Sequence, residues 1–443
     1  MTIDYTSYVK RDRVHSRIFT DREIFDEEMV RIFESGWNFV GHESEVPEPG
    51  DYVTKFIGRQ PVIMSRDSAG SLNLLMNRCR HRGTAVCQQE RGNANFFRCP
   101  YHGWTYGNDG KLVGVPFPSS YGPEFDKDEL GLTRVPVIDS YRGFVFASLR
   151  PVDQPLTEWL GRTVLDVMDM FVSASPTGRI RVRAGSHKTT FKGNWKYVGM
   201  DGYHTNFTHK IVSDLVVRKM PEAGNRFNEM FSDRSPNLTW DLGNGHCRLD
   251  TVHAQGEGYA RIMAGALQAT EGGRAYMASL EEVHGDRAAE VLAKSRDPHL
   301  GVWPNLQLIG VQIRVIRPIA PDRTEVTLYP ALLEGVPDEI NDARLRSHEW
   351  FYGPAGFGQP DDGELFERNQ IGLMADVDPW LFLARGLSTE RHNPDGTIVG
   401  NITDETTQRG QMRQWLSQMA DGAEPGEWAP EGDAPPVRSV GGA

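Results

Sequence analysis

The chain contains 443 residues, of which 39% are hydrophobic and 24% are charged, and its formal net charge is −12. This composition is typical of a globular protein, and the length exceeds that of one ordinary hydrophobic core, so two or three domains are expected. No apolar run approaches the roughly 20 residues that span a bilayer, and the acidic balance argues against a nucleic-acid partner. The first residues lack the basic and apolar regions of a signal peptide, so we expect a soluble, cytoplasmic protein.

A helix with one apolar face is predicted near the N-terminus, over residues 20–36. Thr20 and Asp21 provide the side-chain oxygens that begin helices, and apolar side chains follow at helical spacing. The apolar positions are Ile24, Phe25, Met29, Ile32 and Phe33. We expect residues 1–37 to form a helical segment that packs on a larger domain.

Short β-strands are predicted after this helix, in a domain that extends from residue 38 to residue 152. Apolar and β-branched runs alternate here with glycine and proline. The clearest strands cover residues 51–56, 61–64, 72–76 and 143–147. Their length and spacing predict a small antiparallel β domain.

Two cysteine and histidine pairs inside this β domain predict a metal centre. They read Cys79-x-His81 and Cys99-x-x-His102, with seventeen residues between His81 and Cys99. Two thiolates and two imidazoles suit either a structural zinc ion or a Rieske cluster, in which two cysteines hold one iron and two histidines hold the other. A glycine close behind each histidine permits a tight turn around sulfur. The spacing resembles that of Rieske proteins, so we expect a [2Fe-2S] cluster here.

The following residues, 153–421, contain both strand-like and helix-like segments, which predicts an α+β domain. Strands are expected within residues 179–191, 238–252, 306–319 and 324–333, two helices within 258–295, and one long helix over 338–352. This irregular order favours an antiparallel sheet wrapped by helices, of the helix-grip type. Residues 422–443 are rich in glycine, proline and acidic residues, which predicts an extended tail.

A second candidate metal centre lies between residues 201 and 209. His204 and His209 stand five positions apart, or about 140° around a regular α-helix, so we expect a bulge or a helix end between them. Asp201 and His204 share a helix face, which suits a carboxylate that hydrogen-bonds the second nitrogen of a ligating imidazole. Two histidines and one carboxylate form the iron(II) site of many non-haem oxygenases. Spacing alone leaves the carboxylate open among Asp361, Asp362 and Glu364.

The order of these elements resembles the large (alpha) subunits of Rieske non-haem iron aromatic-ring-hydroxylating dioxygenases. The likeness covers roughly residues 15–375 and includes the N-terminal helix, both cysteine and histidine loops, Asn194-Trp195-Lys196, Asp-x-Tyr-His-x4-His, and Gly-Pro-Ala-Gly-Phe with the Asp-Asp pair behind it. The resemblance implies that His204, His209 and Asp362 hold the iron. It also implies that Asp201 bridges an iron-ligating histidine to His102 of an adjacent subunit.

The chain departs from the family pattern between Lys196 and Asp201. Only the residues 197–200 separate them, about three fewer than the family usually has, which is close to one helical turn. The missing residues include an asparagine that often stands near the iron. The expected effect is a change in the local geometry and in the upper wall of the pocket, with the ligands kept.

The resemblance implies an oxygenase component that uses O2 and electrons from NAD(P)H to dihydroxylate or hydroxylate an aromatic substrate. The sequence shows no nicotinamide or flavin fingerprint, so a separate reductase or ferredoxin is expected to supply electrons. The family assembles into rings, and we expect a homotrimer or an α3β3 assembly with a small beta subunit.

Further residues are assigned by their position near the expected centres. Candidates for the substrate pocket are Met200, Phe207, Val212, Leu215, Asn305, Gln307, Phe351 and Phe357. Asn305 and Gln307 would favour a substrate with a polar substituent if they face the iron. Five arginines surround the two cysteine and histidine loops and are either solvated loop charges or a docking face for an acidic ferredoxin. They are Arg78, Arg80, Arg82, Arg91 and Arg98. Cys87 and Cys247 are expected to be buried free thiols. None of the other histidines has a partner at the spacing of a metal-ligand pair. Among them, His253 is the best candidate for a pocket residue.

Two alternatives stay open from the sequence. One is a Rieske monooxygenase or an O- or N-demethylase that acts on a carbon outside an aromatic ring. The other is a protein without catalytic activity, either a Rieske electron carrier or a zinc-stabilised binding protein, for which the second constellation would be accidental.

Overall fold

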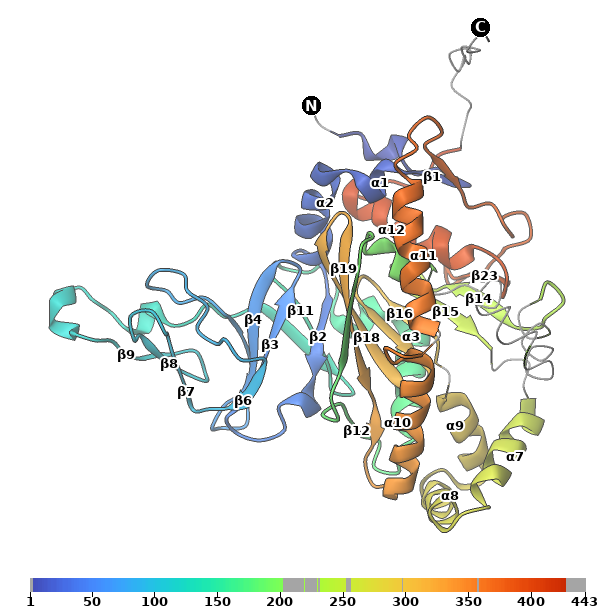
Figure 1. The fold of residues 1–443 in the computed structure, drawn as a ribbon, viewed down its shortest axis with the longest axis horizontal. Coiled ribbons are helices and arrows are strands. Elements are labelled where there is room, and N and C mark those ends of the chain that lie inside the picture. The colour runs from blue at the N-terminus through green and yellow to red at the C-terminus, as the bar shows by residue number, and fades with distance from the viewer. Residues whose placement is uncertain are drawn as a thin grey trace, which may run out of the picture.

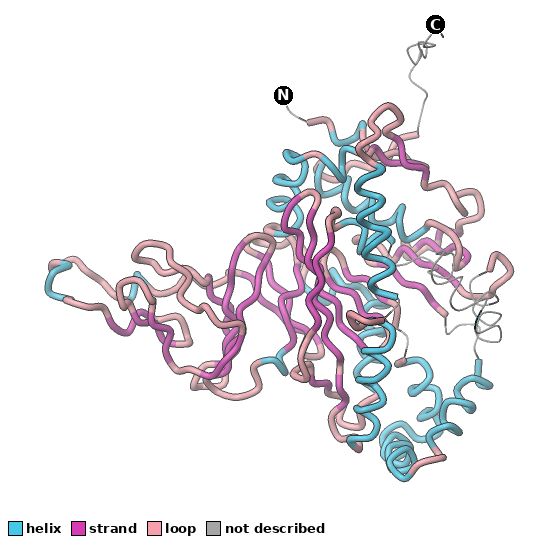
Figure 2. Tube along the Cα trace, viewed as in Figure 1, coloured by secondary structure: helices cyan, strands magenta, loops and turns pink. Residues whose placement is uncertain are grey.

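The computed structural model describes residues 3–201, 219, 229, 232–251, 256–296, 298–356 and 358–427. A β-rich lobe projects from a larger body in which helices lie against a broad sheet (Figure 1). Figure 2 shows the same division, with short strands and long loops in the lobe and the long helices in the body. None of the helices in these residues is both long enough and apolar enough to cross a bilayer.

The N-terminal segment confirms the predicted amphipathic helix and refines its bounds. It contains β1 (Arg13–His15), α1 (Arg17–Thr20), α2 (Arg22–Glu28) and a π-helical turn (Met29–Phe33). The Asp21 carboxylate accepts from the amides of Glu23 (2.8 Å) and Ile24 (3.4 Å), which caps α2. All five predicted apolar positions are buried. The segment packs on α12 (Thr406–Met419), and β1 pairs with β21 (Trp380–Phe382), so it belongs to the body.

The lobe is built from three small antiparallel sheets, as the short predicted strands require. The sheet orders are β5-β4-β3-β6, β7-β8-β9 and β10-β11-β2. The strands are β2 (Asn38–His42), β3 (Asp51–Ile57), β4 (Gln60–Arg66), β5 (Leu72–Met76), β6 (Arg91–Asn93), β7 (Phe96–Arg98), β8 (Thr105–Gly107), β9 (Leu112–Gly114), β10 (Val137–Tyr141) and β11 (Phe144–Ser148). Buried Cys87 packs in the core of this lobe, as expected for a free thiol.

Among the described residues, nine strands of the body form one antiparallel sheet in the order β13-β19-β18-β17-β16-β15-β14-β23-β22. They are β13 (His187–Phe191), β14 (Leu238–Asp241), β15 (Cys247–Asp250), β16 (Leu300–Val302), β17 (Leu306–Ile309), β18 (Gln312–Ala320), β19 (Arg323–Pro330), β22 (Arg391–His392) and β23 (Ile398–Asn401). A separate pair joins β12 (Ile180–Arg181) to β20 (Leu332–Leu333). Cys247 is buried on this sheet.

The helices of the body are α3 (Leu156–Ser173), α4 (Lys196–Asp201), α7 (Gly256–Leu267), α8 (Glu271–His284), α9 (Ala288–Ser295), α10 (Asp338–Tyr352), α11 (Gly358–Gly372) and α12. The α+β fold is confirmed, and α10 matches its predicted range. The expectation of two helices within residues 258–295 is wrong, because three are present. Thr270 caps α8 through the Gly273 amide (3.0 Å), and Gly285, with a φ of +59°, ends it.

Two large hydrophobic clusters hold the body together. One lies between α3, α8, α9 and strands β16 to β18, and also includes Trp37 and, from the base of the lobe, Phe144 and Phe146. The other lies between the N-terminal helices, α4 and α12. The helix that leads toward residues 202–209 is therefore fixed in a core and not at the surface.

Candidate metal centres

The two cysteine and histidine loops of the lobe have the same backbone design. The Cys79 amide donates to the Thr84 carbonyl at 2.8 Å, and the Cys99 amide donates to the Trp104 carbonyl at 2.7 Å. Each loop therefore closes on itself around its cysteine, and the hydrogen bond fixes the direction of the residues in between.

A glycine with positive φ completes each loop. Gly83 has a φ of +79° and Gly103 a φ of +74°, a region that side chains disfavour. Their amides donate to the carbonyls of Cys79 (2.9 Å) and Cys99 (3.0 Å). The two glycines are thus explained by backbone conformation, as the sequence predicts.

The four predicted cluster ligands lie in these loops, and each histidine has a ring nitrogen that makes no hydrogen bond within the described residues. Cys79 and Cys99 are buried, and the rings of His81 and His102 lie 4.7 Å apart between centroids. The Nδ1 atoms of both histidines are buried and have no hydrogen-bond partner in the part of the chain that the structure describes. A buried unpaired nitrogen is costly, and ligation to a metal removes that cost. The residues fit a cluster held by two thiolates and two imidazoles.

The surroundings of these ligands restrict their protonation and orientation. The His81 ring stacks on Trp104, with centroids 5.1 Å apart and planes 3° apart. Burial, and then the nearby Arg82, lower the pKa of His102, which favours the neutral imidazole that ligates metals. The Tyr106 hydroxyl lies 3.2 Å from Cys79 Sγ. Burial raises the pKa of Tyr106, so the hydroxyl keeps its proton and can donate it toward sulfur.

In the body, a buried ion pair anchors the start of α4. The Lys196 ammonium lies 2.5 Å from Glu28 Oε1, and neither side chain is exposed. The indole nitrogens of Trp195 (2.8 Å) and Trp415 (2.6 Å) donate to the same carboxylate. The side-chain Nδ2 of Asn194 donates to the carbonyls of Phe19 (3.1 Å) and Pro321 (2.9 Å). The Asn-Trp-Lys motif thus fixes the helix that ends at Asp201.

Two buried carboxylates lie near the start of α11. Asp361 and Asp362 are 5% and 4% exposed, whereas Glu364 is exposed and paired with Arg368 at 2.8 Å. Buried carboxylates ordinarily occur where they are paired or bind a cation. Burial therefore favours the two aspartates over Glu364 as the third iron ligand.

Helix α11 packs on the segment that leads into α4. The rings of Tyr197 and Phe366 stack with centroids 5.9 Å apart and planes 14° apart. The Asn194 backbone amide donates to the Gln370 side chain at 3.0 Å, and the Lys192 backbone amide donates to the Glu367 carboxylate at 2.9 Å. The structure therefore joins the helix of Asp362 to the helix of Asp201, which stand far apart in the sequence.

Some predicted residues lie outside the described residues. They are His204, Phe207, His209, Val212, Leu215, His253 and Phe357. Asp201 is the last residue of α4 and only its backbone is described. The expected bulge between the two histidines and their convergence with Asp362 stay predictions.

The described pocket candidates differ in what their side chains contact. Met200 is buried in the cluster around α4. Phe351 covers the start of α11, where a Cβ on Gly358 would come within 2.1 Å of its ring. Asn305 exchanges two hydrogen bonds of 2.9 Å with the Phe39 backbone, so its amide joins body to lobe. Gln307 donates to the Val198 carbonyl at 2.7 Å, and its Oε1 is buried without a described hydrogen-bond partner.

Sequence reasoning missed Glu28 and Tyr106. Glu28 stands in a helix whose apolar face alone was recognised, and its partner Lys196 follows 168 positions later. Tyr106 is separated from Cys79 by 27 positions, so no local spacing joins the two. The single available signal was the presence of Lys196 in an otherwise apolar run after Trp195.

Comparisons with known proteins agree with this architecture. A family model described as the Rieske [2Fe-2S] domain matches residues 36–139, and one described as the ring hydroxylating alpha subunit (catalytic domain) matches residues 179–421. A naphthalene 1,2-dioxygenase structure with indole bound in the active site has a TM-score of 0.80 and 26% identity, and the match covers 94% of this chain and 95% of that chain.

Relatives among curated proteins match most of the chain. The 2-halobenzoate 1,2-dioxygenase large subunit of Burkholderia cepacia is 34% identical, over 86% of this chain and 82% of the relative. The anthranilate 1,2-dioxygenase large subunit of Acinetobacter baylyi is 34% identical, over 93% and 90%. The N,N-dimethyl phenylurea N-demethylase subunit alpha of a Sphingobium species is 29% identical, over 91% of both. The chain belongs to the family of Rieske non-haem iron aromatic-ring-hydroxylating dioxygenase alpha subunits, the oxygenase components of these systems.

Proposed function

We propose that this alpha subunit adds both atoms of O2 to the ring of an aromatic substrate that carries a carboxylate. The packing of α11 on α4 and on the residues just before it is the main support, because it joins buried Asp362 to the helix that leads to His204 and His209. The two large-subunit relatives named for 2-halobenzoate and anthranilate support the substrate class.

In this proposal His204, His209 and Asp362 hold the iron, and Cys79, His81, Cys99 and His102 hold the cluster. When bound, the cluster supplies electrons one at a time and the iron supplies open positions for O2. Asp201 hydrogen-bonds an iron-ligating histidine in its own chain and His102 of an adjacent subunit. Asp201 thereby orients both imidazoles.

The proposal requires partners. Electrons from NAD(P)H reach the chain through a separate reductase or ferredoxin, and the assembly is a homotrimer or α3β3, in the cytoplasm. Exposed arginines around the two loops support a docking face for an acidic donor protein, since rim charges steer association. These are Arg78, Arg80, Arg82, Arg91 and Arg98.

Labelled oxygen tests the reaction. The protein with its reductase is supplied with benzoate, 2-halobenzoates, anthranilate and 18O2, and the products are analysed by mass spectrometry. We expect one product with both labelled atoms. An Asp362→Ala variant should keep the cluster absorption, lose the second kind of iron and form no product. Failure of every aromatic carboxylate with both centres intact would contradict the proposed substrate class.

N-demethylation is a second candidate, because the N,N-dimethyl phenylurea N-demethylase alpha subunit is 29% identical over 91% of the chain. Hydroxylation of an N-methyl carbon would use O2, two electrons and two protons, and would release formaldehyde, water and the demethylated nitrogen compound. Formaldehyde formation from N-methyl arylureas, without labelled ring products from aromatic carboxylates, would favour this function over ring dihydroxylation.

A further inference from the structure

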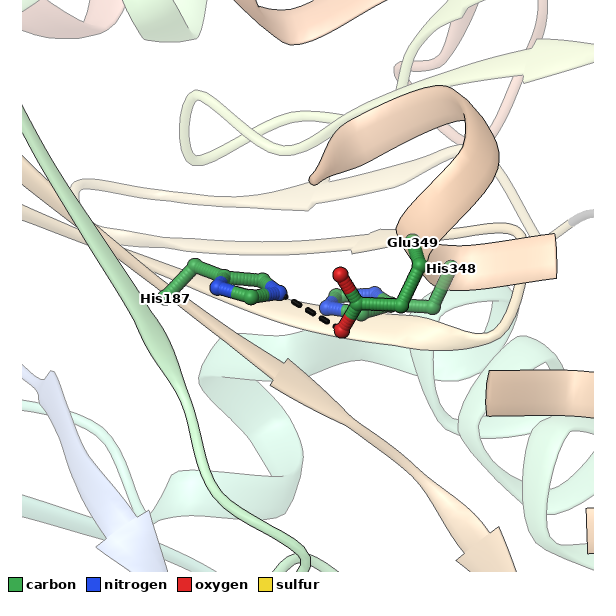
Figure 3. Close-up of side chains that lie close together, drawn as sticks. All are labelled: His187, His348 and Glu349. Atoms are coloured by element: carbon green, nitrogen blue, oxygen red, sulfur yellow. Dashed lines mark hydrogen bonds and ion pairs between the residues drawn. The ribbon is translucent and has the colours of Figure 1, made fainter. Parts of the chain in front are cut away.

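Three side chains from two elements of the body converge on one point, and none of them is a predicted iron ligand. They are His187 on β13 and His348 and Glu349 at the end of α10 (Figure 3). One ligand atom from each lies within 4.8 Å of the others. The side chains of His187 and Glu349 are partly exposed, so the group is reachable from solvent.

The contacts of this group leave one potential metal-ligating nitrogen without a described hydrogen-bond partner. His187 Nε2 lies 2.8 Å from Glu349 Oε1, and the rings of His187 and His348 are almost parallel, with planes 9° apart and centroids 5.3 Å apart. His348 is fully buried, and its Nε2 has no hydrogen-bond partner among the residues that the structure describes. A buried imidazole nitrogen without a partner loses solvation and gains nothing in return, unless it binds a ligand.

Burial is the main reason that the His348 ring is neutral. Burial, and then His187, lower the pKa of His348 to about 4, with Arg314 acting in the same direction and Glu349 against it. Arg314 lies over the Tyr352 ring, 4.9 Å from its centroid. Neutral imidazole is the form that ligates metals, and Glu349 supplies a negative charge at the same point.

We propose that His187, His348 and Glu349 form a binding site for a divalent transition-metal ion such as Zn2+. Two imidazoles and one carboxylate are a common donor set for Zn2+, with a remaining position open to water. A metal lies in the plane of each imidazole that binds it, so the stacked rings must turn before both can bind one ion. The His187 and Glu349 side chains are 25% and 55% exposed and can move, whereas buried His348 is the fixed member.

Such an ion would tie β13 to the end of α10. Helix α10 ends at Tyr352 and is followed closely by α11, which carries Asp362. The site uses none of the residues proposed to hold iron or the cluster, so it is independent of the proposed function.

Zinc binding to the complete, iron-loaded protein tests this site. Equilibrium dialysis against Zn2+ followed by metal analysis should give one zinc per chain, with the iron content unchanged. His187→Ala should lose that zinc, and Glu349→Gln should weaken its binding roughly tenfold or more. Matched controls are His392→Ala, an exposed histidine on β22, and Glu339→Gln, an exposed carboxylate on α10, and both should bind zinc as the wild type does.

Three results would overturn the proposal. The first is that the iron-loaded wild type binds no zinc. The second is that zinc binds only when iron is lost. The third is that both site variants bind zinc with unchanged affinity. Because both substitutions remove partly exposed side chains, circular dichroism and the cluster absorption serve as the check that each variant is folded.

Discussion

At the scale of single residues, buried histidines show how the fold selects a protonation state. His246 is 1% exposed, its Nδ1 accepts from the Trp303 amide at 3.1 Å, and its Nε2 faces the Trp159 carbonyl at 3.1 Å. Nε2 therefore carries the single proton of a neutral ring. Burial lowers the pKa of His246 from 6.5 to about 4. Such a histidine makes folding dependent on pH.

Stability should fall as the pH decreases from 6.5 toward 4, because the unfolded chain then binds a proton that folded His246 refuses. Between pH 7 and pH 5 this one group should cost about 2 kcal/mol. His246→Gln keeps a donor and an acceptor without a titratable group. Urea unfolding at both pH values should show the wild type losing about 2 kcal/mol more than the variant. Equal losses in the two proteins would show that His246 does not cause the pH dependence.

The Tyr106 hydroxyl is positioned to influence the reduction potential of the cluster, because it lies 3.2 Å from Cys79 Sγ. A donor directed at a cysteine sulfur stabilises the reduced, more negative cluster and raises its potential. Tyr106→Phe should therefore lower the midpoint potential by roughly 60 mV, the equivalent of about 1.4 kcal/mol in a one-electron couple. Redox titration measures this shift. An unchanged potential with intact cluster absorption would remove Tyr106 from this role.

Prediction of site residues from sequence depends on how local their spacing is. Cys79 and His81, or Cys99 and His102, lie in one loop each, so ligand chemistry is readable from the chain. The pairing of His187 with His348 depends on β13 lying beside the end of α10, and no local pattern encodes that contact. For the same reason the sequence indicated the Asp361 and Asp362 pair and could not show that both are buried.

At the scale of elements, the start of α4 depends on one carboxylate from α2. Glu28 receives Lys196 and two tryptophan side chains, all of them buried. Removal of its charge would leave a buried ammonium group without compensation.

Glu28→Gln should therefore reduce the free energy of unfolding by about 3 to 5 kcal/mol. The double variant Glu28→Gln, Lys196→Met removes both charges and should recover most of this loss, since the remaining groups are neutral. Urea unfolding of the wild type, the two single variants and the double variant gives the coupling energy. Additive losses in the double variant would contradict a direct interaction.

Elements with clear end signals were predictable, and those without them were not. Helix α10 has its predicted range, and Asp21 caps α2 as expected. The stretch from Gly256 to Ser295 has nearly continuous helical periodicity, and the breaks depend on the cap at Thr270 and the positive φ at Gly285. Periodicity reports the buried face of a helix and is insensitive to a break that leaves that face in register.

At the scale of the whole molecule, the lobe is held firmly on the body. Asn305 bonds both backbone groups of Phe39, and the Lys55 ammonium from the lobe lies 2.9 Å from the Tyr329 hydroxyl of the body. The sequence predicted two metal-bearing domains and their fold class. It could not predict these contacts, because they join residues more than 260 positions apart.

The central proposal is that Asp201 couples the cluster of one subunit to the iron of the next. The most direct test reduces the Asp201→Asn variant without oxygen, adds the aromatic substrate that the wild type accepts and then O2, and follows cluster reoxidation and product in one turnover. We expect cluster absorption and iron content equal to the wild type, with substrate-dependent reoxidation and product formation slowed roughly 100-fold or more. Reoxidation and product formation at the wild-type rate, with both metals present, would contradict the account.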